Sequence, residues 1–326
     1  MEKQLSIVIP TYNRKERLLN QLRSIFKQQK YFFTSIIILD NCSSYTIEQE
    51  LNNNFSKQEL SHVEVIQRVY NIGMASNISS SFMNCKTKWM WLLSDDDETE
   101  IEALDIILDN IRRNPDVAVF KYSIGGEKLI FVPEEDKTIS SIDEYIEYYK
   151  MGVHTSGNMI FMSNNIFNLE VLKPYLGYAN IYSYTYIPHL IPLIAGLAEK
   201  KVKLKLCSKA IIKYLHPVAG SEWNFITTIL GLSSFADINQ NITLSNKQQN
   251  ELSGLVVRDF SHIKFLECLF LIKDRKARKY FYEKVFKSLY IHTNISKWRY
   301  YLIFFIMYYL NINIISMGKK IRKILK

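Results

Sequence analysis

The first 125 residues alternate short apolar segments with amphipathic ones, and this alternation is the feature that most constrains the fold. Residues 5–10, 35–40 and 88–93 are strand-length runs rich in apolar, β-branched or aromatic side chains. Over residues 18–26 and 101–111, by contrast, apolar residues recur at helical spacing. Strands that alternate with helices predict an α/β fold with a mostly parallel sheet and crossover helices.

The pattern becomes less regular after residue 128 and purely helical after residue 223. A turn at 156–158 predicts a strand over 159–161, and an apolar stretch predicts a helix over 186–197. Two short strands are expected, over 202–207 and 211–215. We therefore expect a first domain over residues 1–223 and a C-terminal all-helical appendage over 224–326, with a polar loop over 239–250 and a long helix over 251–273.

The C-terminal sequence combines aromatic, apolar and basic residues. The run 298–310 is mostly aromatic and aliphatic but contains Arg299, and five Lys and Arg residues follow it between 319 and 326. A membrane-spanning helix needs about 20 mainly apolar residues, which this run does not provide. The pattern favours docking on an anionic membrane surface. The alternatives are burial against the chain's own helices and a homodimer interface.

Charge and cysteine content narrow the class of protein further. The net charge is +9, but acidic residues gather between 95 and 109 and again between 134 and 147. This uneven distribution argues against a nucleic-acid binder, which would carry basic and aromatic residues on its sheet. The four cysteines are far apart, and the first apolar run is too short for the core of a signal peptide. We expect a cytoplasmic protein.

Polar side chains follow three of the predicted strands. They are Thr11 to Asn13 after the first strand, Asp40 and Asn41 after the second, and Ser94 to Asp97 after the fourth. In parallel sheets, ligands bind beyond the carboxyl ends of the strands. Three separate strands that deliver polar groups to one edge predict a ligand site there.

The acidic triplet Asp95-Asp96-Asp97 indicates the chemistry of that site. Adjacent carboxylates repel one another unless a cation offsets their charge. Carboxylate oxygens suit Mg²⁺ or Mn²⁺, which usually bridge to substrate phosphates. The alternative is a solvated acidic turn that caps the following helix.

Four motifs together resemble family 2 glycosyltransferases. They are Ser6 to Arg14, Ile38 to Ser43, Asn71-Ile72-Gly73 with Asn77, and Leu92 to Asp97, in matching order and spacing over about residues 4–125. The resemblance implies the GT-A fold, a nucleotide-sugar donor and inversion at the sugar carbon. The Ser-Asp-Asp-Asp version is similar to transferases of bacterial O-antigen or capsule assembly, including the abequosyltransferase type.

The resemblance assigns roles to individual residues. It places Pro10, Thr11 and Tyr12 against the nucleoside, Asp40 and Asn41 at the base, and Arg68, Asn71 and Asp95 near the nucleotide. The family often has Asp where Asn41 stands, so the base stays open among uracil, thymine, cytosine and guanine. The alternative for Asn41 is a turn residue that bonds its own backbone.

The metal and the catalytic base follow from the same resemblance. Ser94 stands at the first position of the usual Asp-X-Asp, which makes Asp96 the expected metal ligand, with Asp97 in support. His216 is the candidate second ligand, because such enzymes often supply a late histidine; the alternative is a turn histidine before proline.

The usual acidic motif for the base is absent, so His189 is the candidate base. His154 and Glu222 are weaker candidates, and the alternative for His189 is packing in an apolar helix.

These patterns predict a metal-dependent, inverting glycosyltransferase that acts in bacterial surface polysaccharide biosynthesis. The donor would be a UDP-, dTDP-, CDP- or GDP-linked hexose or deoxyhexose, and the acceptor a lipid-linked saccharide. The enzyme would lie on the inner face of the plasma membrane. The alternative is a scaffold or nucleotide-sugar-binding protein that kept the fold without catalysis.

Overall fold

The chain forms two compact units. The computed structural model describes residues 3–125, 133, 135–151, 156–213, 225–258, 268–269, 271–292, 298, 301–302 and 305. The first unit comprises Met1–Tyr148 and Ile160–Ser221, and the second comprises Tyr149–Met159 and Glu222–Lys326. The division into domains at residues 1–223 and 224–326 stays a prediction, and the assignment of 149–159 to the second unit has no counterpart in it.

A nine-stranded sheet organises the first unit, in the order β3-β2-β1-β4-β8-β6-β9-β5 with β7 paired to β9. The strands are β1 (Leu5–Thr11), β2 (Thr34–Asp40), β3 (Val63–Gln67), β4 (Trp89–Leu92), β5 (Glu98–Thr99), β6 (Val119–Gly125), β7 (Lys137–Ile139), β8 (Asn165–Asn168) and β9 (Leu204–Lys213). Strands β3, β2, β1 and β4 run parallel, whereas β8 is antiparallel to both β4 and β6. The predicted α/β class is confirmed.

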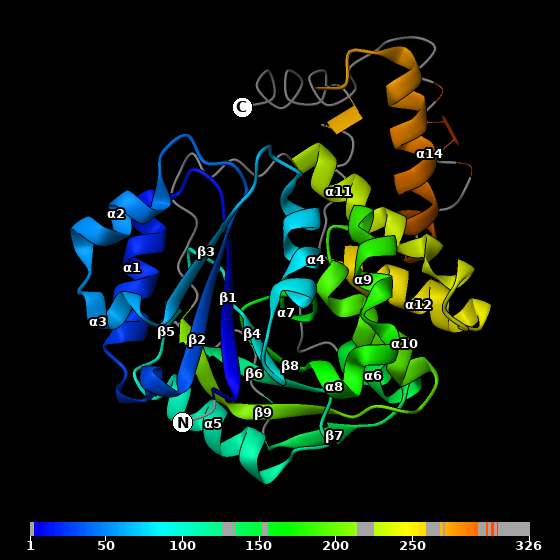
Figure 1. Cartoon of the computed structure of the whole chain (residues 1–326). Coiled ribbons are helices and arrows are strands. Elements are labelled where there is room, and N and C mark those ends of the chain that lie inside the picture. Colours follow the sequence, from blue (N-terminus) through cyan, green and yellow to red (C-terminus); the bar gives the residue numbers. More distant parts are fainter. Residues whose placement is uncertain are drawn as a thin grey trace, which may run out of the picture. The chain divides into compact units, whose positions relative to one another are not determined.

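Helices flank the parallel strands, which explains why those strands are apolar on both faces. Figure 1 shows α1 (Lys15–Phe26), α2 (Ile47–Asn54) and α3 (Lys57–Leu60) on one side of β1 to β3, and α4 (Met74–Asn84) on the other. Helix α5 (Ala103–Arg113) also belongs to this unit. The remaining short helices are η1 (Gln29–Phe33), α6 (Ile142–Lys150), α7 (Ser156–Ile160), α8 (Leu169–Leu172), η2 (Lys173–Tyr175), α9 (Gly177–Ile181) and η3 (Ser183–Thr185).

The structure differs from the sequence prediction in three places. The strand expected over 159–161 is wrong, because helix α7 ends there and the strand is β8; three apolar residues do not distinguish helix from strand. The helix expected over 186–197 is split into η4 (Pro188–Leu190) and α10 (Ile191–Ala198), each with a proline in its first turn. The strands expected over 202–207 and 211–215 form one strand, β9, as far as the described residues reach, and residues 208 and 209 form an irregularity in its pairing with β6 rather than a break.

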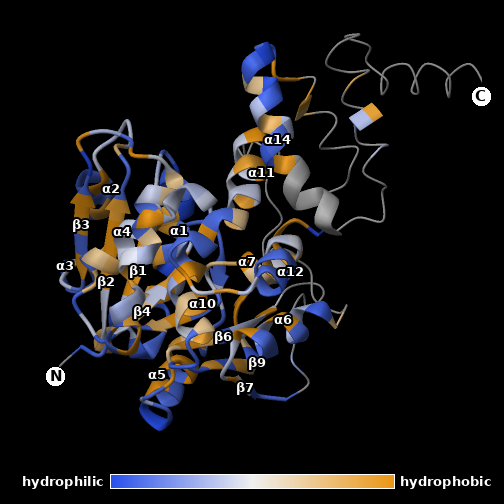
Figure 2. Cartoon of the chain, turned by 90° about the vertical axis from the view of Figure 1, so that its right-hand side faces the viewer, coloured by the Kyte–Doolittle hydropathy of each residue, from blue (hydrophilic) through white to orange (hydrophobic). Residues whose placement is uncertain are grey.

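The described residues of the second unit form helices and the loops between them, with no strand among them. Besides most of α7, its helices are α11 (Phe225–Ser233), η5 (Ser234–Gln240), α12 (Asn246–Val257) and α14 (Arg275–His292). Helix α12 begins earlier than predicted because Ser245 and Gln248 form a capping box. Figure 2 shows hydrophilic residues at the start of α14, where Arg and Lys dominate the sequence. Within the described ranges, no helix has both the length and the apolar character needed to cross a bilayer.

Candidate functional site

Three strand ends meet at one edge of the sheet, as the sequence predicted. Thr11 at the end of β1 pairs in register with Asp40 at the end of β2. Strand β4 runs parallel to β1 on its other side, and the Thr11 hydroxyl donates a 2.7 Å hydrogen bond to Asp95 Oδ2. The polar groups that follow the three strands therefore form one continuous site.

Two arginines of the first crossover segment balance the acidic triplet. Arg14 Nη1 donates to Asp95 Oδ1 at 2.9 Å and to Asp96 Oδ2 at 3.0 Å, and Arg17 Nη1 donates to the same Asp96 oxygen at 3.0 Å. We call these four residues the edge cluster. Burial raises the pKa of Asp95 even though Arg14 and the Thr11 hydroxyl act in the opposite direction. Guanidinium groups thus supply the compensating charge that the sequence assigned to a metal ion.

The three carboxylates differ in how well solvent reaches them. The side chain of Asp96 is 32% exposed, whereas Asp95 is 3% and Asp97 9% exposed. Ser94 Oγ donates to Asp96 Oδ1 at 2.5 Å, and Ser163 Oγ donates to Asp97 Oδ2 at 2.5 Å. Burial raises the pKa of Asp97 to about 7. Asp96 is therefore the one member of the triplet that presents its carboxylate to an incoming ligand.

Asp96 fits a divalent ion better than Asp97 does. A single carboxylate completed by phosphate oxygens and water is a ligand set that Mg²⁺ and Mn²⁺ accept. Asp97 is nearly buried and bonded to Ser163, so it suits a supporting role. His216, the predicted second ligand, lies outside the described residues, and within the described part no three His, Cys, Asp or Glu side chains gather into a metal site.

Amide hydrogen bonds fix the end of the site where the sequence predicts the nucleotide base. Asn41 Nδ2 donates to Asn71 Oδ1 at 2.8 Å, and Asn41 Oδ1 accepts from the backbone N–H of Ile72 at 2.9 Å. Gly73, at φ +85°, lets the chain turn into α4. The Asn41 side chain thus holds the loop 71–73 rather than its own backbone.

The neighbouring Asp40 keeps one oxygen unused. Its Oδ1 accepts from the backbone N–H of Ser43 at 3.0 Å, while Oδ2 is buried without a hydrogen-bond partner among the described residues. Buried polar atoms are rarely left unpaired without a reason. An N–H group from a bound base would satisfy this oxygen.

The other predicted nucleotide contacts are also at this edge. Pro10 is half-buried in β1, and Tyr12 is 42% exposed just beyond it. Arg68 donates its backbone N–H to Asp40 O at 2.9 Å, and its Nη2 donates to Ser80 Oγ at 2.6 Å. Arg68 therefore ties β3 to β2 and to α4, so that its backbone, like the Asn41 side chain, helps to fix this end.

His189 lies in the interior rather than at the edge. It is 2% exposed, and its Nε2 lies 3.0 Å from the backbone carbonyl of Ile160, which requires that nitrogen to carry the proton. Burial, with a smaller contribution from Lys121, lowers the pKa of His189 to about 3. Its Nδ1 is buried without a hydrogen-bond partner among the described residues, and the catalytic role of His189 stays a prediction. The weaker candidates His154 and Glu222 lie outside the described residues.

A second polar cluster, which the sequence did not predict, surrounds Lys121 in β6. Lys121 Nζ donates to Asn164 Oδ1 at 3.1 Å and to Asn165 Oδ1 at 3.3 Å. Burial lowers the pKa of Lys121 to about 7. We call Lys121, Asn164, Asn165 and His189 the inner cluster. It adjoins Ser163, whose Oγ accepts from the Ser94 N–H at 2.9 Å and donates to Asp97.

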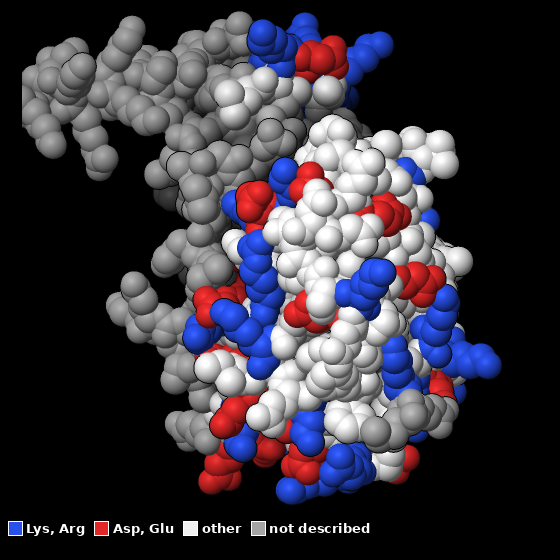
Figure 3. Space-filling model, turned by 60° about the vertical axis from the view of Figure 1, so that its left-hand side comes forward, with Lys and Arg blue, Asp and Glu red and all other residues white. Residues whose placement is uncertain are grey.

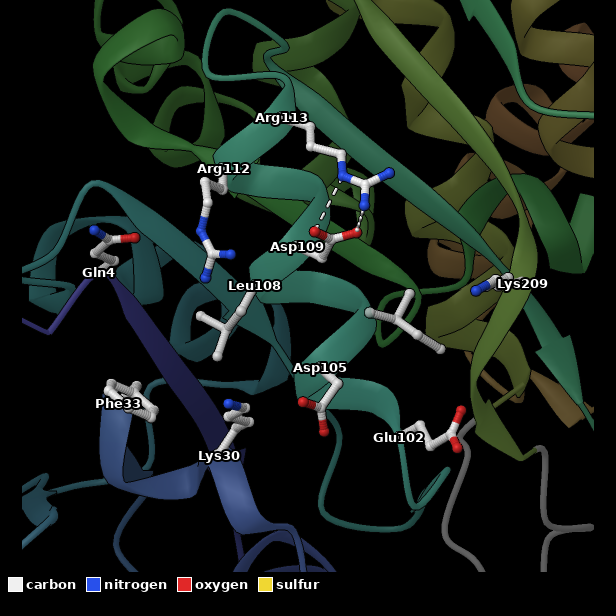
Figure 4. A pocket seen from close by; sticks show the side chains of 11 residues that line it. Gln4, Lys30, Phe33, Glu102, Asp105, Leu108, Asp109, Arg112, Arg113 and Lys209 are labelled. Carbon is white, nitrogen blue, oxygen red and sulfur yellow. Dashed lines mark hydrogen bonds and ion pairs between the residues drawn. The ribbon is translucent and has the colours of Figure 1, made fainter.

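Described residues of the first unit line two cavities that bear on the site. The larger, of about 730 Å³, is lined by Gln4, η1 and α5 (Figure 4), so it lies near the start of β1 rather than at the carboxyl edge. Its charges are mixed, and Arg113 pairs with Asp109 inside it. The smaller, of about 360 Å³, adjoins the acidic triplet on the α1 side.

Arg14, Arg17 and Ser163 had no predicted role. The arginines had a weak signal, since they lie one helical turn apart just after the first strand. No sequence signal pointed to Ser163, because its contacts with Ser94 and Asp97 span more than 60 residues of sequence.

Comparison with known proteins finds a matching family and a similar curated protein. Residues 6–166 match the family described as Glycosyl transferase family 2. An uncharacterized glycosyltransferase of Haemophilus influenzae is 32% identical over 113 residues, which cover 35% of this chain and 36% of that protein. The chain therefore matches only about a third of the length of this curated relative.

Solved structures resemble the chain over most of its length. S. aureus TarS 1–349 in complex with UDP-GlcNAc has a TM-score of 0.55 at 13% identity, with 89% of each chain covered. The mannosyltransferase PcManGT from Pyrobaculum calidifontis, in complex with GDP-Man and Mn²⁺, has a TM-score of 0.51 at 10% identity and covers 89% of this chain and 87% of its own. At such identities the likeness shows the fold alone, which is GT-A-like.

Proposed function

From the glycosyl transferase family 2 domain at residues 6–166, we propose that the chain transfers a sugar from a nucleotide-sugar donor to a saccharide acceptor. The observation that carries the proposal is the convergence of three strand ends on one edge, where Thr11 bonds Asp95 and Asp96 faces solvent. This edge offers an unused base acceptor at one end and charged groups suited to phosphates at the other.

The base end favours donors whose base carries a ring N–H. Asp40 Oδ2 is a buried acceptor without a partner among the described residues, so it needs a hydrogen-bond donor. Uracil, thymine and guanine can present a ring N–H to this oxygen, whereas the cytosine ring nitrogen at that position is an acceptor and only its exocyclic amino group could donate. UDP-, dTDP- and GDP-sugars are therefore favoured over CDP-sugars. TarS and PcManGT were solved with UDP-GlcNAc and GDP-Man, which accords with this choice.

The phosphate end is proposed to bind the diphosphate with a divalent ion. Asp96 would hold Mn²⁺ or Mg²⁺, with Asp97 in support and His216 as the candidate partner from later in the chain. A metal ion there would offset the charge that grows on the diphosphate as the glycosidic bond breaks. Arg14 and Arg17 would release Asp96 and remain close enough to share that negative charge.

The acceptor, the pathway and the location are proposed from the C-terminal sequence and the family resemblance. We assign the chain to surface polysaccharide assembly of the abequosyltransferase type, with inversion, on a lipid-linked acceptor at an anionic membrane surface. Trp298, Tyr301, Leu302 and Phe305 are each about half-exposed or more on helical backbone, at the spacing that aligns side chains along one helix face. A chain that ends at Ser296 should lose binding to anionic vesicles; unchanged binding would reject the docking role.

A thermal-shift panel tests the donor assignment. UDP, dTDP, GDP and CDP are compared, each with and without Mn²⁺, because a ligand that binds only the folded state raises its apparent stability. At a concentration 100 times Kd, the stabilisation is about 2.7 kcal/mol. One of the first three should give the largest shift, and Mn²⁺ should increase it. A largest shift with CDP would contradict the base assignment.

The second candidate is a donor-binding protein without catalysis. It is favoured by one observation, the burial of His189, which leaves no assigned base. Hydrolysis of the bound donor to nucleoside diphosphate and free sugar separates the candidates, because only the enzyme would accelerate it. A donor that binds but is not hydrolysed or transferred would favour the second candidate.

A further inference from the structure

The smaller cavity has features that the donor site does not explain. Helix α1 contributes Arg17, Asn20, Gln21, Arg23 and Ser24, together with its C-cap residue Lys27, and the acidic run 95–98 forms the opposite wall. Its volume of about 360 Å³ lies within the range of about 300–1,000 Å³ that is usual for small-molecule sites.

Gln21 is the first sign that this cavity takes a ligand. Its side chain is 2% exposed, yet neither Nε2 nor Oε1 has a hydrogen-bond partner among the described residues. Buried amides are nearly always paired, and leaving both atoms unpaired destabilises the fold. A hydroxyl group can satisfy both atoms, because it donates to the oxygen and accepts from the nitrogen.

The charges of the cavity are the second sign. Arg23 donates only to two neutral amides, Asn20 and Asn54, and Lys27 Nζ has no hydrogen bond or ion pair within the described part of the chain. On the opposite wall, Asp95 is occupied by Thr11 and Arg14. Among the described residues, no carboxylate therefore pairs with Arg23 or Lys27.

The other acidic residues of this wall also have partners among the described residues. Asp97 is bonded to the neutral Ser163 hydroxyl, Asp96 pairs with Arg14 and Arg17, and Glu98 pairs with Lys213. Figure 3, which brings the α1 side toward the viewer, shows Lys and Arg side chains among Asp and Glu side chains rather than one uniform patch. A ligand here must present an anionic group to particular cations, which favours a defined site over general attraction.

We propose that this cavity binds an anionic, hydroxylated group, a carboxylate or phosphate carried on a saccharide or polyol. The anion would pair with Lys27 and Arg23, and a neighbouring hydroxyl would bond the Gln21 amide. Because Asp96 lines both this cavity and the donor site, the group would belong to the acceptor saccharide, an assignment that rests on the proposed transferase function.

Binding to the full chain tests the proposal directly. With the donor site saturated by the nucleoside diphosphate that gives the largest thermal shift, glucuronate and glycerol 3-phosphate are titrated by calorimetry, with glucose, glycerol and inorganic phosphate as comparison probes. At least one anionic, hydroxylated probe should bind at least tenfold more tightly than its neutral counterpart. Inorganic phosphate that binds as tightly as both would overturn the role of the hydroxyl.

Substitutions in the cavity complete the test. Gln21→Met and Lys27→Met should each weaken binding of the preferred probe about tenfold, the loss of roughly one hydrogen bond or ion pair. Lys15→Met is the matched control, because Lys15 lies on the same helix but pairs with Glu50 outside the cavity. Equal binding by all four proteins, or no binding by any, would show a cavity that holds only water.

A melting experiment without ligand distinguishes a binding role from a defect of packing. Gln21→Met should raise the melting temperature by about 2–4 °C, since an unpaired buried amide is removed. Greater stability together with weaker probe binding supports the site, whereas a lower melting temperature would show that Gln21 is already satisfied. If no nucleotide stabilises the wild-type chain, the donor assignment fails while the result for the cavity still stands.

Discussion

The edge cluster and the inner cluster are both polar groups in an α/β unit, but their surroundings differ. In the edge cluster, carboxylates face guanidinium groups at strand ends, and Asp96 is 32% exposed. In the inner cluster, the fully buried ammonium of Lys121 is held by amide oxygens, beside a histidine with a pKa of about 3. The edge cluster can exchange partners with a ligand, whereas the inner cluster can only hold chain segments together.

The largest expected effect comes from Asp96→Ala. If the edge cluster binds the diphosphate, this change should lower kcat/KM about 10²- to 10³-fold, the usual loss when one stabiliser of developing charge is removed. The melting temperature should change little, because the carboxylate is 32% exposed and Arg14 keeps Asp95 as a partner. Asp109→Ala, which removes an exposed partner of Arg113, is the control for charge alone. Full activity of Asp96→Ala would remove the edge cluster from the donor site.

Ser163→Ala tests whether the two clusters are connected. The change leaves Asp97 and the Ser94 N–H without their partner, which should cost about 1–3 kcal/mol of stability. Because the same bonds position the triplet, kcat should also fall about tenfold, in keeping with the cost of small misplacements. Ser123→Ala is the matched control, since Ser123 is equally buried and only donates to Cys207 O. Equal kinetics in the two variants would show that Ser163 is purely structural.

Lys121→Met tests the electrostatics of the inner cluster. The folded pKa of about 7 is below the ordinary 10.5, so the unfolded chain binds more protons between pH 7 and 10.5. Wild-type stability should therefore rise with pH in this window, by at most about 1.4 kcal/mol per pH unit from this group. The variant should lack that rise, as judged by urea midpoints at pH 7, 8 and 9. Lys88→Met, which removes a half-exposed lysine, should keep it.

The same contrast explains what the sequence could predict. Thr11, Asp40 and the acidic triplet directly follow apolar runs, and parallel strands place such ends at one edge. Lys121, however, lies within an apolar run, and its partners Asn164 and Asn165 approach it only because β8 inserts antiparallel beside β6. Local periodicity carries no information on such long-range pairing. Arg14 and Arg17 were not predicted as partners of the acidic triplet for a related reason. Repulsion among three carboxylates requires a compensating positive charge, but it does not say whether arginine or a metal ion supplies that charge.

The smallest effect is expected from His189→Gln, which tests the one residue proposed for catalysis that lies in the inner cluster. The Ile160 carbonyl needs a donor, and the glutamine amide can provide one in place of Nε2. The imidazole is only 2% exposed, so we expect kcat to stay within about threefold of wild type, or about 0.6 kcal/mol. His189→Phe leaves the carbonyl unpaired and should lower the melting temperature with similar kinetics. A hundredfold loss of kcat in the glutamine variant, with unchanged melting, would instead make His189 the base and would require the inner cluster to open during turnover.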